Sequence, residues 1–154
     1  MTEPVESKPK AQNIRKNSIG WMLKTLCHRL DTDMDKALKQ LNLSPGQFAI
    51  LMALMEREGQ TQTEIGNKMT MPGYATTRNI DALEKMKIVV RRKDERSRRI
   101  YRIHLTDNGR KIAPNLFETV GRINKELLLP LDVLEQKQFK ALLLKVLKMD
   151  QGET

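Results

Sequence analysis

The sequence predicts a mainly α-helical protein with one small β-hairpin, and three patterns support this fold class. Apolar residues recur every three or four positions through most of the chain, as on one face of an α-helix. Residues 88–93 and 100–105 are instead rich in β-branched residues or alternate apolar with polar ones, which is typical of strands. The charged residues 94–99 between these two runs predict the turn of a hairpin.

The first predicted helix covers residues 13–41 and, at ~1.5 Å per residue, is more than about 40 Å long. That is long for a chain of 154 residues. Its apolar stripe repeats at helical spacing and consists of Ile19, Met22, Leu23, Leu26, Cys27, Leu30, Met34, Ala37, Leu38 and Leu41. Residues 1–12 are polar, and we expect disordered tails there and at residues 150–154.

The next two helices are predicted by their start signals. Ser44 before Pro45 combines a capping residue with a first-turn proline, and the helix that follows ends at Glu58-Gly59. Thr61 and Glu64 have the spacing of a capping box, in which each side chain satisfies a backbone amide at the start of a helix. The helix that begins there is short.

A turn at residues 70–73 joins this short helix to another, residues 74–86, with Pro72 at a first-turn position. Two helices joined by a tight turn and followed by a basic hairpin are the parts of a winged helix-turn-helix. In that arrangement the second helix enters the major groove of DNA and the hairpin loop lies beside it. The sequence therefore predicts a winged helix-turn-helix over residues 45–105.

Two more helices complete the chain. Thr106 caps the first of them, and Pro114 within it predicts either a kink or an irregular first turn. Pro130 ends that helix, and Asp132 can cap a last helix, residues 133–148.

The terminal helices predict a homodimer. Residues 134–149 are apolar nearly all round, and such a helix needs burial on more than one side. Two-fold pairing would place two recognition helices about 34 Å apart on DNA. We expect one domain, residues 13–149, with dimerisation helices at residues 13–41 and 107–149. A monomeric helical bundle is the alternative.

The composition favours a polyanionic partner. The formal net charge is +9 and the sequence pI is about 9.8. The low aromatic content, 4%, argues against RNA-binding modes that stack bases on several exposed rings. No apolar run approaches the ~20 residues of a membrane span, and Cys27, the single cysteine, excludes an intrachain disulfide. We expect a cytoplasmic protein with no membrane partner.

The segment Leu105-Thr106-Asp107-Asn108-Gly109, with the arginine-rich turn before it and a preceding helix that ends Leu83-Glu84-Lys85-Met86, resembles the MarR family of bacterial transcriptional regulators. The resemblance covers residues 13–149. It implies a ligand-responsive repressor that binds a pseudo-palindromic operator of double-stranded DNA as a homodimer.

The resemblance places the family's Asp-x-Arg wing motif on Ser97-Arg98-Arg99. The arginine is kept at Arg99, but Ser97 stands where the family has an aspartate that helps to brace the wing. Asp94 and Glu95 are close enough in sequence to substitute for it. The charge of the wing is kept, because residues 87–99 hold seven basic side chains against two acidic ones.

Three groups of residues are expected to contact DNA. In the recognition helix, an arginine can bind guanine with both arms and a threonine can meet a thymine methyl. These candidates are Tyr74, Thr76, Thr77 and Arg78. In the wing, arginine suits a narrow minor groove, and the candidates are Arg96, Arg98 and Arg99. Phosphate contacts are expected from Thr61, Gln62, Thr63, Arg92 and Lys93.

Each group has a structural alternative. The charged hairpin tip could be only a solvated loop. Tyr74 could pack in the core, and Arg78 could pair with Asp81 or Glu84 on its own helix. The residues at the start of the short helix could serve capping alone.

The resemblance also implies a small aromatic or amphipathic effector, for which the candidate pocket residues are Trp21, Met22, His28 and Met55. No cofactor or metal is expected, because Cys27, His28 and His104 lack the spacing of metal ligands. An enzyme is not expected either, since the chain has two histidines and neither a Gly-rich phosphate loop nor a nucleophile motif. The alternative function is a non-specific architectural winged-helix protein that binds nucleic acid.

Overall fold

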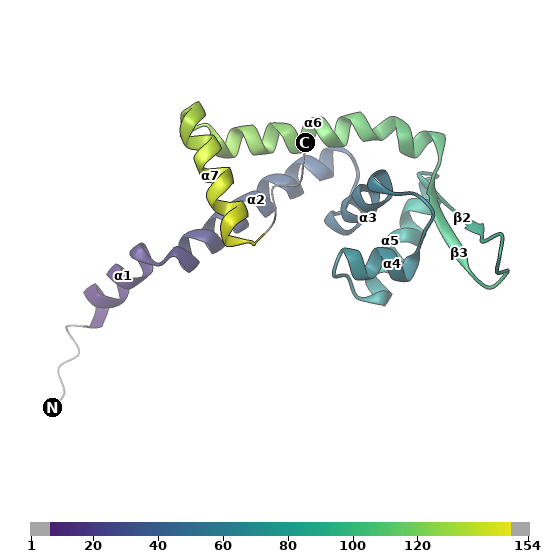
Figure 1. Cartoon of the computed structure of the whole chain (residues 1–154), viewed down its shortest axis with the longest axis horizontal. Helices are drawn as coiled ribbons and strands as arrows, with labels where there is room; N and C mark the ends of the chain where they lie inside the picture. Colours follow the sequence, from purple (N-terminus) through teal and green to yellow (C-terminus); the bar gives the residue numbers. More distant parts are fainter. Residues whose placement is uncertain (1–6, 149–154) are drawn as a thin grey trace.

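The computed structural model describes residues 7–148, which form a winged lobe joined to an extended set of terminal helices (Figure 1). The helices are α1 (Ser7–Asn17), α2 (Ile19–Gln40), α3 (Pro45–Glu56), α4 (Gln62–Lys68), α5 (Gly73–Lys85), α6 (Asp107–Leu128) and α7 (Val133–Val146). The strands are β1 (Gln60–Thr61), β2 (Val89–Lys93) and β3 (Tyr101–Leu105). Helix α6 runs along the top of the molecule in Figure 1, and α7 turns back from its far end.

The N-terminal region differs from the prediction in two respects. Residues 7–12, expected to be disordered, belong to α1, and the single helix expected over residues 13–41 is divided at Ser18. The Ser18 backbone is extended (φ −77°, ψ 115°), and its hydroxyl accepts a hydrogen bond from the Trp21 amide at 3.2 Å. Arg15 lies over the Trp21 indole, 5.3 Å from its centroid, which holds α1 against α2. The tails expected at residues 1–6 and 150–154 lie outside the described residues.

Four predicted helix starts are confirmed by hydrogen bonds. Ser44, Thr61 and Asp132 each form a capping box, and the Thr106 hydroxyl accepts from the Gly109 amide at 3.1 Å. One proline prediction is wrong, because Pro72 is the N-cap of α5 rather than a first-turn residue. Pro114 lies inside α6, beyond its first turn, so of its two alternatives the kink stays a prediction.

Strand β1 was not predicted. It pairs antiparallel with β3, so that the sheet has the order β1-β3-β2. Its first residue, Gln60, is buried, and its amide donates to the carbonyls of Ala53 (2.8 Å) and Arg57 (2.6 Å) at the end of α3. The side chain thus satisfies helix-end carbonyls that would otherwise have no partner.

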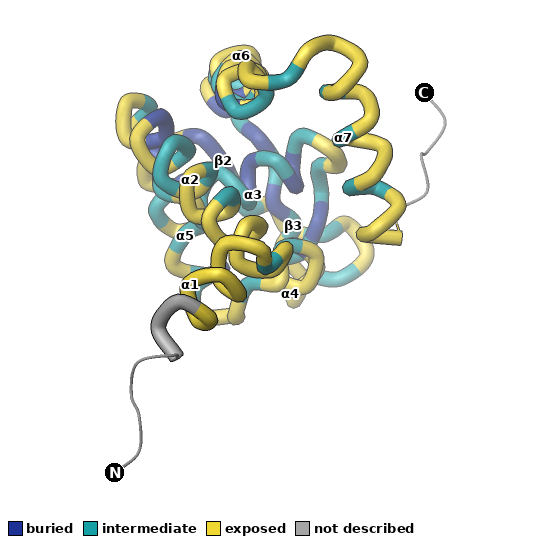
Figure 2. Tube along the Cα trace, turned by 90° about the vertical axis from the view of Figure 1, so that its left-hand side faces the viewer, coloured by how far each residue is buried: buried dark blue, intermediate teal, exposed yellow. Residues whose placement is uncertain are grey.

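The core lies in the winged lobe and against the inner face of α6 (Figure 2). It is built from aliphatic side chains that α3, α4, α5, the sheet and the end of α2 contribute. The fully buried ones include Leu38, Ile50, Leu51, Leu54, Ile65, Ile80, Leu83, Ile103 and Leu116. By contrast, residues 10–17 of α1 are exposed, and α7 has no buried residue, only the exposed and intermediate ones of Figure 2.

The Leu-Thr-x-x-Gly segment joins β3 to α6 at a close approach of two chain segments. The Thr106 hydroxyl donates to the Lys87 carbonyl at 2.6 Å, and the Thr106 amide donates to the Ile88 carbonyl at 3.0 Å. A Cβ at Gly109 would lie 2.2 Å from the Ile88 carbonyl oxygen. Only glycine fits at that position without a shift of the backbone.

Residues 7–148 contain no helix with the length and apolar character that a bilayer span demands.

Candidate nucleic-acid interface

Helix α5, the predicted recognition helix, is held in the lobe by one buried face. Ile80 and Leu83 lie on this face, and so does Thr76, whose hydroxyl donates to the Pro72 carbonyl at 3.1 Å. The prediction that Thr76 faces solvent and contacts DNA is therefore wrong. Thr76 lies one helical turn before Ile80 and shares its inward direction. A Cβ at Gly66 of α4 would lie 2.9 Å from the Thr76 hydroxyl, so the two helices pack closely there.

The opposite face of α5 is open to solvent. Tyr74 is 77% exposed, which excludes the alternative that it packs in the core. Arg78 is exposed as well, and Thr77 is half-buried. Together with Asp81 and Lys85 these residues line a shallow hollow of about 520 Å³.

Arg78 does not pair with the acids of its own helix. Asp81 and Glu84 both bind Arg91 of β2, at 2.5 Å each. Among the ion pairs of residues 7–148 none involves Arg78, so its guanidinium is available for a ligand of the α5 surface.

The start of α4 lies next to this surface. The side-chain amide of Gln62 donates to the Thr77 hydroxyl, which brings together two residues predicted separately as DNA contacts. Thr61 and Glu64 cap the helix reciprocally, and the backbone amide of Thr61 lowers the pKa of the Glu64 carboxyl. Capping therefore occupies Thr61, whereas Thr63 is exposed beside it.

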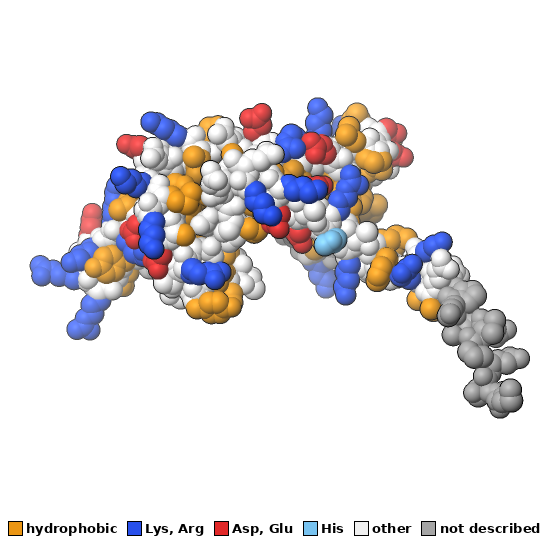
Figure 3. Space-filling view, turned by 180° about the vertical axis from the view of Figure 1, so that it is seen from behind, with side chains coloured by type: hydrophobic (Ala, Val, Ile, Leu, Met, Phe, Trp, Pro, Cys, Tyr) orange, Lys and Arg blue, Asp and Glu red, His pale blue; other side chains and the backbone are white. Residues whose placement is uncertain are grey.

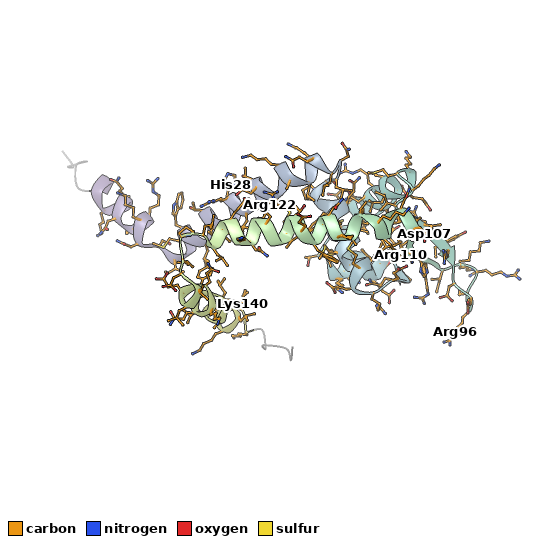
Figure 4. The ribbon with its side chains drawn as sticks, turned by 90° about the horizontal axis from the view of Figure 1, so that it is seen from above. His28, Arg96, Asp107, Arg110, Arg122 and Lys140 are labelled. Carbon is orange, nitrogen blue, oxygen red and sulfur yellow. The ribbon has the colours of Figure 1, made fainter. Side chains whose placement is uncertain are left out.

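The β2–β3 hairpin, the wing, forms one end of the molecule. Basic side chains gather at this end in the space-filling view (Figure 3), and Arg96 lies at its tip in Figure 4. The exposed basic residues are Arg92, Lys93, Arg96, Arg98 and Arg99. Three of them, Arg92, Lys93 and Arg96, also line a hollow of about 450 Å³ with Arg102 and His104.

Asp94 braces the wing tip in place of the aspartate that the family has at position 97. One carboxylate oxygen accepts from the amides of Arg96 (2.8 Å) and Ser97 (3.1 Å), and the other binds the Arg102 guanidinium. The Arg102 hydrogen bond, with help from the Arg96 amide, lowers the pKa of the Asp94 carboxyl. Of the two acids near the tip, the structure thus brings Asp94 into the bracing position.

Glu58 connects the wing to α6. Its carboxylate accepts two hydrogen bonds from Arg110, at 2.8 and 2.9 Å, and one from the Leu105 amide at 3.2 Å. His104 Nδ1 lies 3.5 Å from the same carboxylate. Sequence analysis missed Glu58, Arg91 and Arg102, because their ion pairs join residues that only the folded chain brings together.

The structure does not bring the four predicted effector-pocket residues together within one chain. Met55 lines a hollow of about 290 Å³ between α3, the end of β3 and α6, with Arg110 and Phe117 among its walls. Trp21 and Met22 are about half exposed at the start of α2. His28 is exposed further along α2, away from Arg110 in Figure 4.

A larger, mostly apolar hollow of about 620 Å³ lies between α2, α6 and α7. Its lining includes Leu30, Leu127, Phe139 and Leu143. The hollow lies far from the wing, near Lys140 in Figure 4.

Comparison with known proteins places this arrangement among bacterial regulators. A family model described as MarR family matches residues 41–100. YsmB of Bacillus subtilis, described as an uncharacterised HTH-type transcriptional regulator, is 39% identical over 75 residues, which are 49% of this chain and 51% of YsmB. MdtR of the same organism, an HTH-type transcriptional repressor, is 25% identical over 93 residues, 60% of each chain. The matched segment thus spans about half the length of YsmB.

Solved structures share the whole architecture. The transcriptional repressor CouR, bound to a 23-mer DNA duplex, superimposes with a TM-score of 0.76 at 26% identity, over 88% of this chain and 94% of CouR. Apo MarR from E. coli has the same fold, with a TM-score of 0.77 at 24% identity, over 84% of this chain and 96% of MarR. The winged lobe thus matches the MarR family over residues 41–100, and the chain shares the fold of the CouR and MarR structures.

Proposed function

We propose that the protein is a sequence-specific transcriptional regulator that binds double-stranded DNA. The observation that carries this proposal is the placement of two ligand-accessible groups on one lobe. Tyr74 and Arg78 are exposed on α5, and five exposed basic residues lie on the neighbouring wing. A helix that offers an arginine to base edges beside a cationic loop suits a major groove and its flanking minor groove.

The assigned roles follow from this placement. Arg78 reads a base pair with both arms, while Tyr74 and Thr77 contact bases or sugar-phosphate at the same groove. Arg96, Arg98 and Arg99 enter the minor groove. Gln62, Thr63, Arg92 and Lys93 contact phosphates. The CouR complex with a DNA duplex supports this use of the shared fold.

We further propose that the active form is a homodimer on a pseudo-palindromic operator. Helix α7 exposes Val133, Leu134, Leu142, Val146 and Leu147, each more than 60% exposed in the single chain. A second copy that covers this helix and the apolar hollow between α2, α6 and α7 would bury them. The dimer would then present two recognition helices to successive major grooves.

Repression relieved by a small amphipathic or aromatic effector is the expected mode of regulation. MdtR, described as a repressor, supports the repression alone. The hollow beside Met55 combines the apolar Phe117 with Arg110, which Glu58 of the same lining already pairs, so an aromatic acid would bind there by displacing Glu58 from Arg110. Thermal-shift measurements with a panel of aromatic acids test it. Binding that Phe117→Ala abolishes supports this site, and binding that the variant leaves unchanged excludes it.

The test of specificity is selection of genomic fragments by the purified protein at near-physiological salt. Mobility shift of the enriched fragment against scrambled duplex then gives the specificity ratio. A sequence-specific regulator prefers its operator by about 10³-fold or more. The alternative, a non-specific architectural protein, binds every duplex with similar affinity and a steep salt dependence.

Two substitutions separate the roles within the interface. Arg78→Ala should relax discrimination at one base pair, at a cost of ~1–3 kcal/mol. Arg99→Ala should weaken binding most at AT-rich flanks, where the minor groove is narrow. Arg29→Ala, at an exposed arginine of α2, removes the same charge from a surface remote from α5. A uniform loss of affinity in the Arg78 variant would instead assign that residue to a phosphate.

A further inference from the structure

Arg91 differs from the other basic residues of the wing because it faces inward. It lies at the centre of β2, and its side chain is 22% exposed, whereas its neighbours Arg92 and Lys93 are exposed. Its guanidinium reaches α5, where Nη1 donates to Glu84 and Nη2 to Asp81, both at 2.5 Å. Its backbone amide also donates to the second oxygen of Glu84, at 3.1 Å.

These contacts fix a strand to a helix at three points. A guanidinium is a rigid planar fork, so two carboxylates that bind its separate arms constrain direction as well as distance. Asp81 and Glu84 are three residues apart and therefore neighbours on one face of α5. Burial alone would lower the pKa of the Arg91 guanidinium, but the hydrogen bonds with Asp81 and Glu84 outweigh it and raise that pKa. Arg91 stays charged and engaged.

The restrained elements are the two that carry the candidate DNA contacts. Arg78 lies on α5, one turn before Asp81, and the wing tip continues from β2 through the Asp94 brace. Both arms of Arg91 are occupied by carboxylates and its side chain is 22% exposed, so its charge is already paired and poorly placed for a phosphate. The role of Arg91 is therefore different from that of its exposed neighbours.

We propose that Arg91 is a positioning residue that sets the angle between α5 and the wing, so that both can engage adjacent grooves of one DNA site in a single register. The proposal rests on the proposed function for its consequence in DNA binding. The geometric part concerns the free protein and can be tested without DNA.

The geometric test measures the distance between α5 and the wing tip by pulsed electron spin resonance. Spin labels are placed at Tyr74→Cys and Glu95→Cys in a Cys27→Ser background, and the labelled protein is diluted with unlabelled chain so that intrachain distances dominate. We expect a narrow distance distribution, a broad one with Arg91→Met, and an intermediate one with Arg91→Lys, which can hold only one carboxylate at a time. Arg92→Met, the same change one residue away, should leave it narrow. Equal widths in all four proteins would overturn the proposal.

A second variant tests the same ion pairs without changing Arg91, so that misfolding caused by Arg91→Met alone can be recognised. Asp81→Asn with Glu84→Gln removes the clamp from the helix side and should broaden the distribution as Arg91→Met does. Circular dichroism and urea unfolding identify any variant that has lost its fold. If only Arg91→Met broadens the distribution, and the variant with both carboxylates replaced does not, the assigned partners are wrong and the proposal fails.

The DNA test separates positioning from phosphate contact. Arg91→Met should reduce the preference for operator over scrambled duplex by about tenfold, comparable to the loss of one base contact. It should leave the slope of log K against log salt unchanged, whereas Arg92→Met should reduce that slope by about 0.9. In the Asp81→Asn, Glu84→Gln background the effect of Arg91→Met should vanish. If Arg91→Met lowers the salt slope as Arg92→Met does, Arg91 is a phosphate contact. If neither duplex is bound by any variant, the proposed function fails while the distance measurement still stands.

Discussion

The winged lobe and the last helix differ in how far their apolar side chains are buried. Helix α3, with 12 residues, contributes four buried residues to the core, namely Ile50, Leu51, Ala53 and Leu54. Helix α7, with 14 residues and four leucines against two in α3, contributes no buried residue. The difference lies in the surroundings: α3 is enclosed by α2, α4, α5 and β3, while α7 borders a hollow that it shares with α2 and α6.

The lobe therefore completes its core within one chain, with help from α2 and α6, whereas α7 leaves its apolar side chains unburied. Full burial of a leucine or valine side chain is worth about 1.5–3 kcal/mol. For α7 that stabilisation becomes available when a second copy covers it, and it then depends on protein concentration. Four substitutions test this difference between the lobe and the terminal helices.

Leu142→Glu should abolish dimerisation at micromolar concentration while the lobe remains folded. Leu142 is 62% exposed in the single chain. A two-fold interface would lose about 1.5–3 kcal/mol twice and would also have to bury two carboxylates. We expect the dissociation constant to rise by more than about 100-fold, as measured by sedimentation equilibrium. Lys39→Glu, on the exposed end of α2, is the control, and an unchanged dimer in Leu142→Glu would remove α7 from the interface.

Gly109→Ala should destabilise the lobe by about 1–3 kcal/mol, because the new Cβ would lie 2.2 Å from the Ile88 carbonyl oxygen and the junction must shift. Gly121→Ala, in the same helix, has no atom within 4 Å of the new Cβ and should stabilise α6 by about 0.5–1 kcal/mol. Urea unfolding measures both. If both substitutions change the free energy of unfolding in the same direction, the close contact at Gly109 does not set the first turn of α6 apart from the rest of the helix.

Lys87→Gly should raise the stability of the lobe slightly. Lys87 has φ 58°, a left-handed conformation that costs an L-residue about 1–2 kcal/mol. Glycine removes this strain but has more freedom in the unfolded chain, so the net gain is a few tenths to about 1 kcal/mol. Lys111→Gly, within α6, should instead cost about 1 kcal/mol. A loss of stability in Lys87→Gly would mean that the lysine side chain matters more than its backbone conformation.

The difference in stability between the wild-type protein and Asp94→Asn should depend on pH in one direction. The pKa of the Asp94 carboxyl is lowered in the folded wing, chiefly by the Arg102 hydrogen bond. Its contribution is therefore present above the unfolded pKa of about 3.9 and is lost as pH falls through the lower folded value. Urea midpoints from pH 7 to pH 2 measure this difference. Asp31→Asn, on exposed α2, is the matched change in charge, and a difference that grows on acidification would contradict the brace.

The parts that sequence predicted well are those decided by neighbours along the chain. The caps at Ser44, Thr61, Thr106 and Asp132 use hydrogen bonds across two or three residues, and the wing strands follow from alternation. The break at Ser18 was missed because the apolar stripe begins only at Ile19, so residues 13–18 were joined to the helix without a pattern of their own. Thr76 was assigned to the wrong face because a threonine near a helix start looks polar, whereas its buried setting depends on Gly66 from another helix.

The sequence predicted which residues of the site are charged, but not which of them form ion pairs with one another. The exposed arginines of the wing follow from composition. Their support does not, because Asp94 with Arg102, Arg91 with Asp81, and Glu58 with Arg110 join separate elements. Strand β1 was out of reach for a related reason, since two residues carry no periodicity and pair only with a strand 43 positions away, as between Gln60 and Ile103.

The Glu58 carboxylate accepts hydrogen bonds from Arg110 of α6 and from the Leu105 amide of β3. It thereby couples the orientation of α6 to that of the wing. Helix α6 has 22 residues and is about 33 Å long. A rotation of about 5° at its first turn would sweep its far end through about 3 Å, given that length. Conversely, a displacement of that size at the end next to α7 would reach the wing as a small change of angle, unless the Glu58 contacts break first.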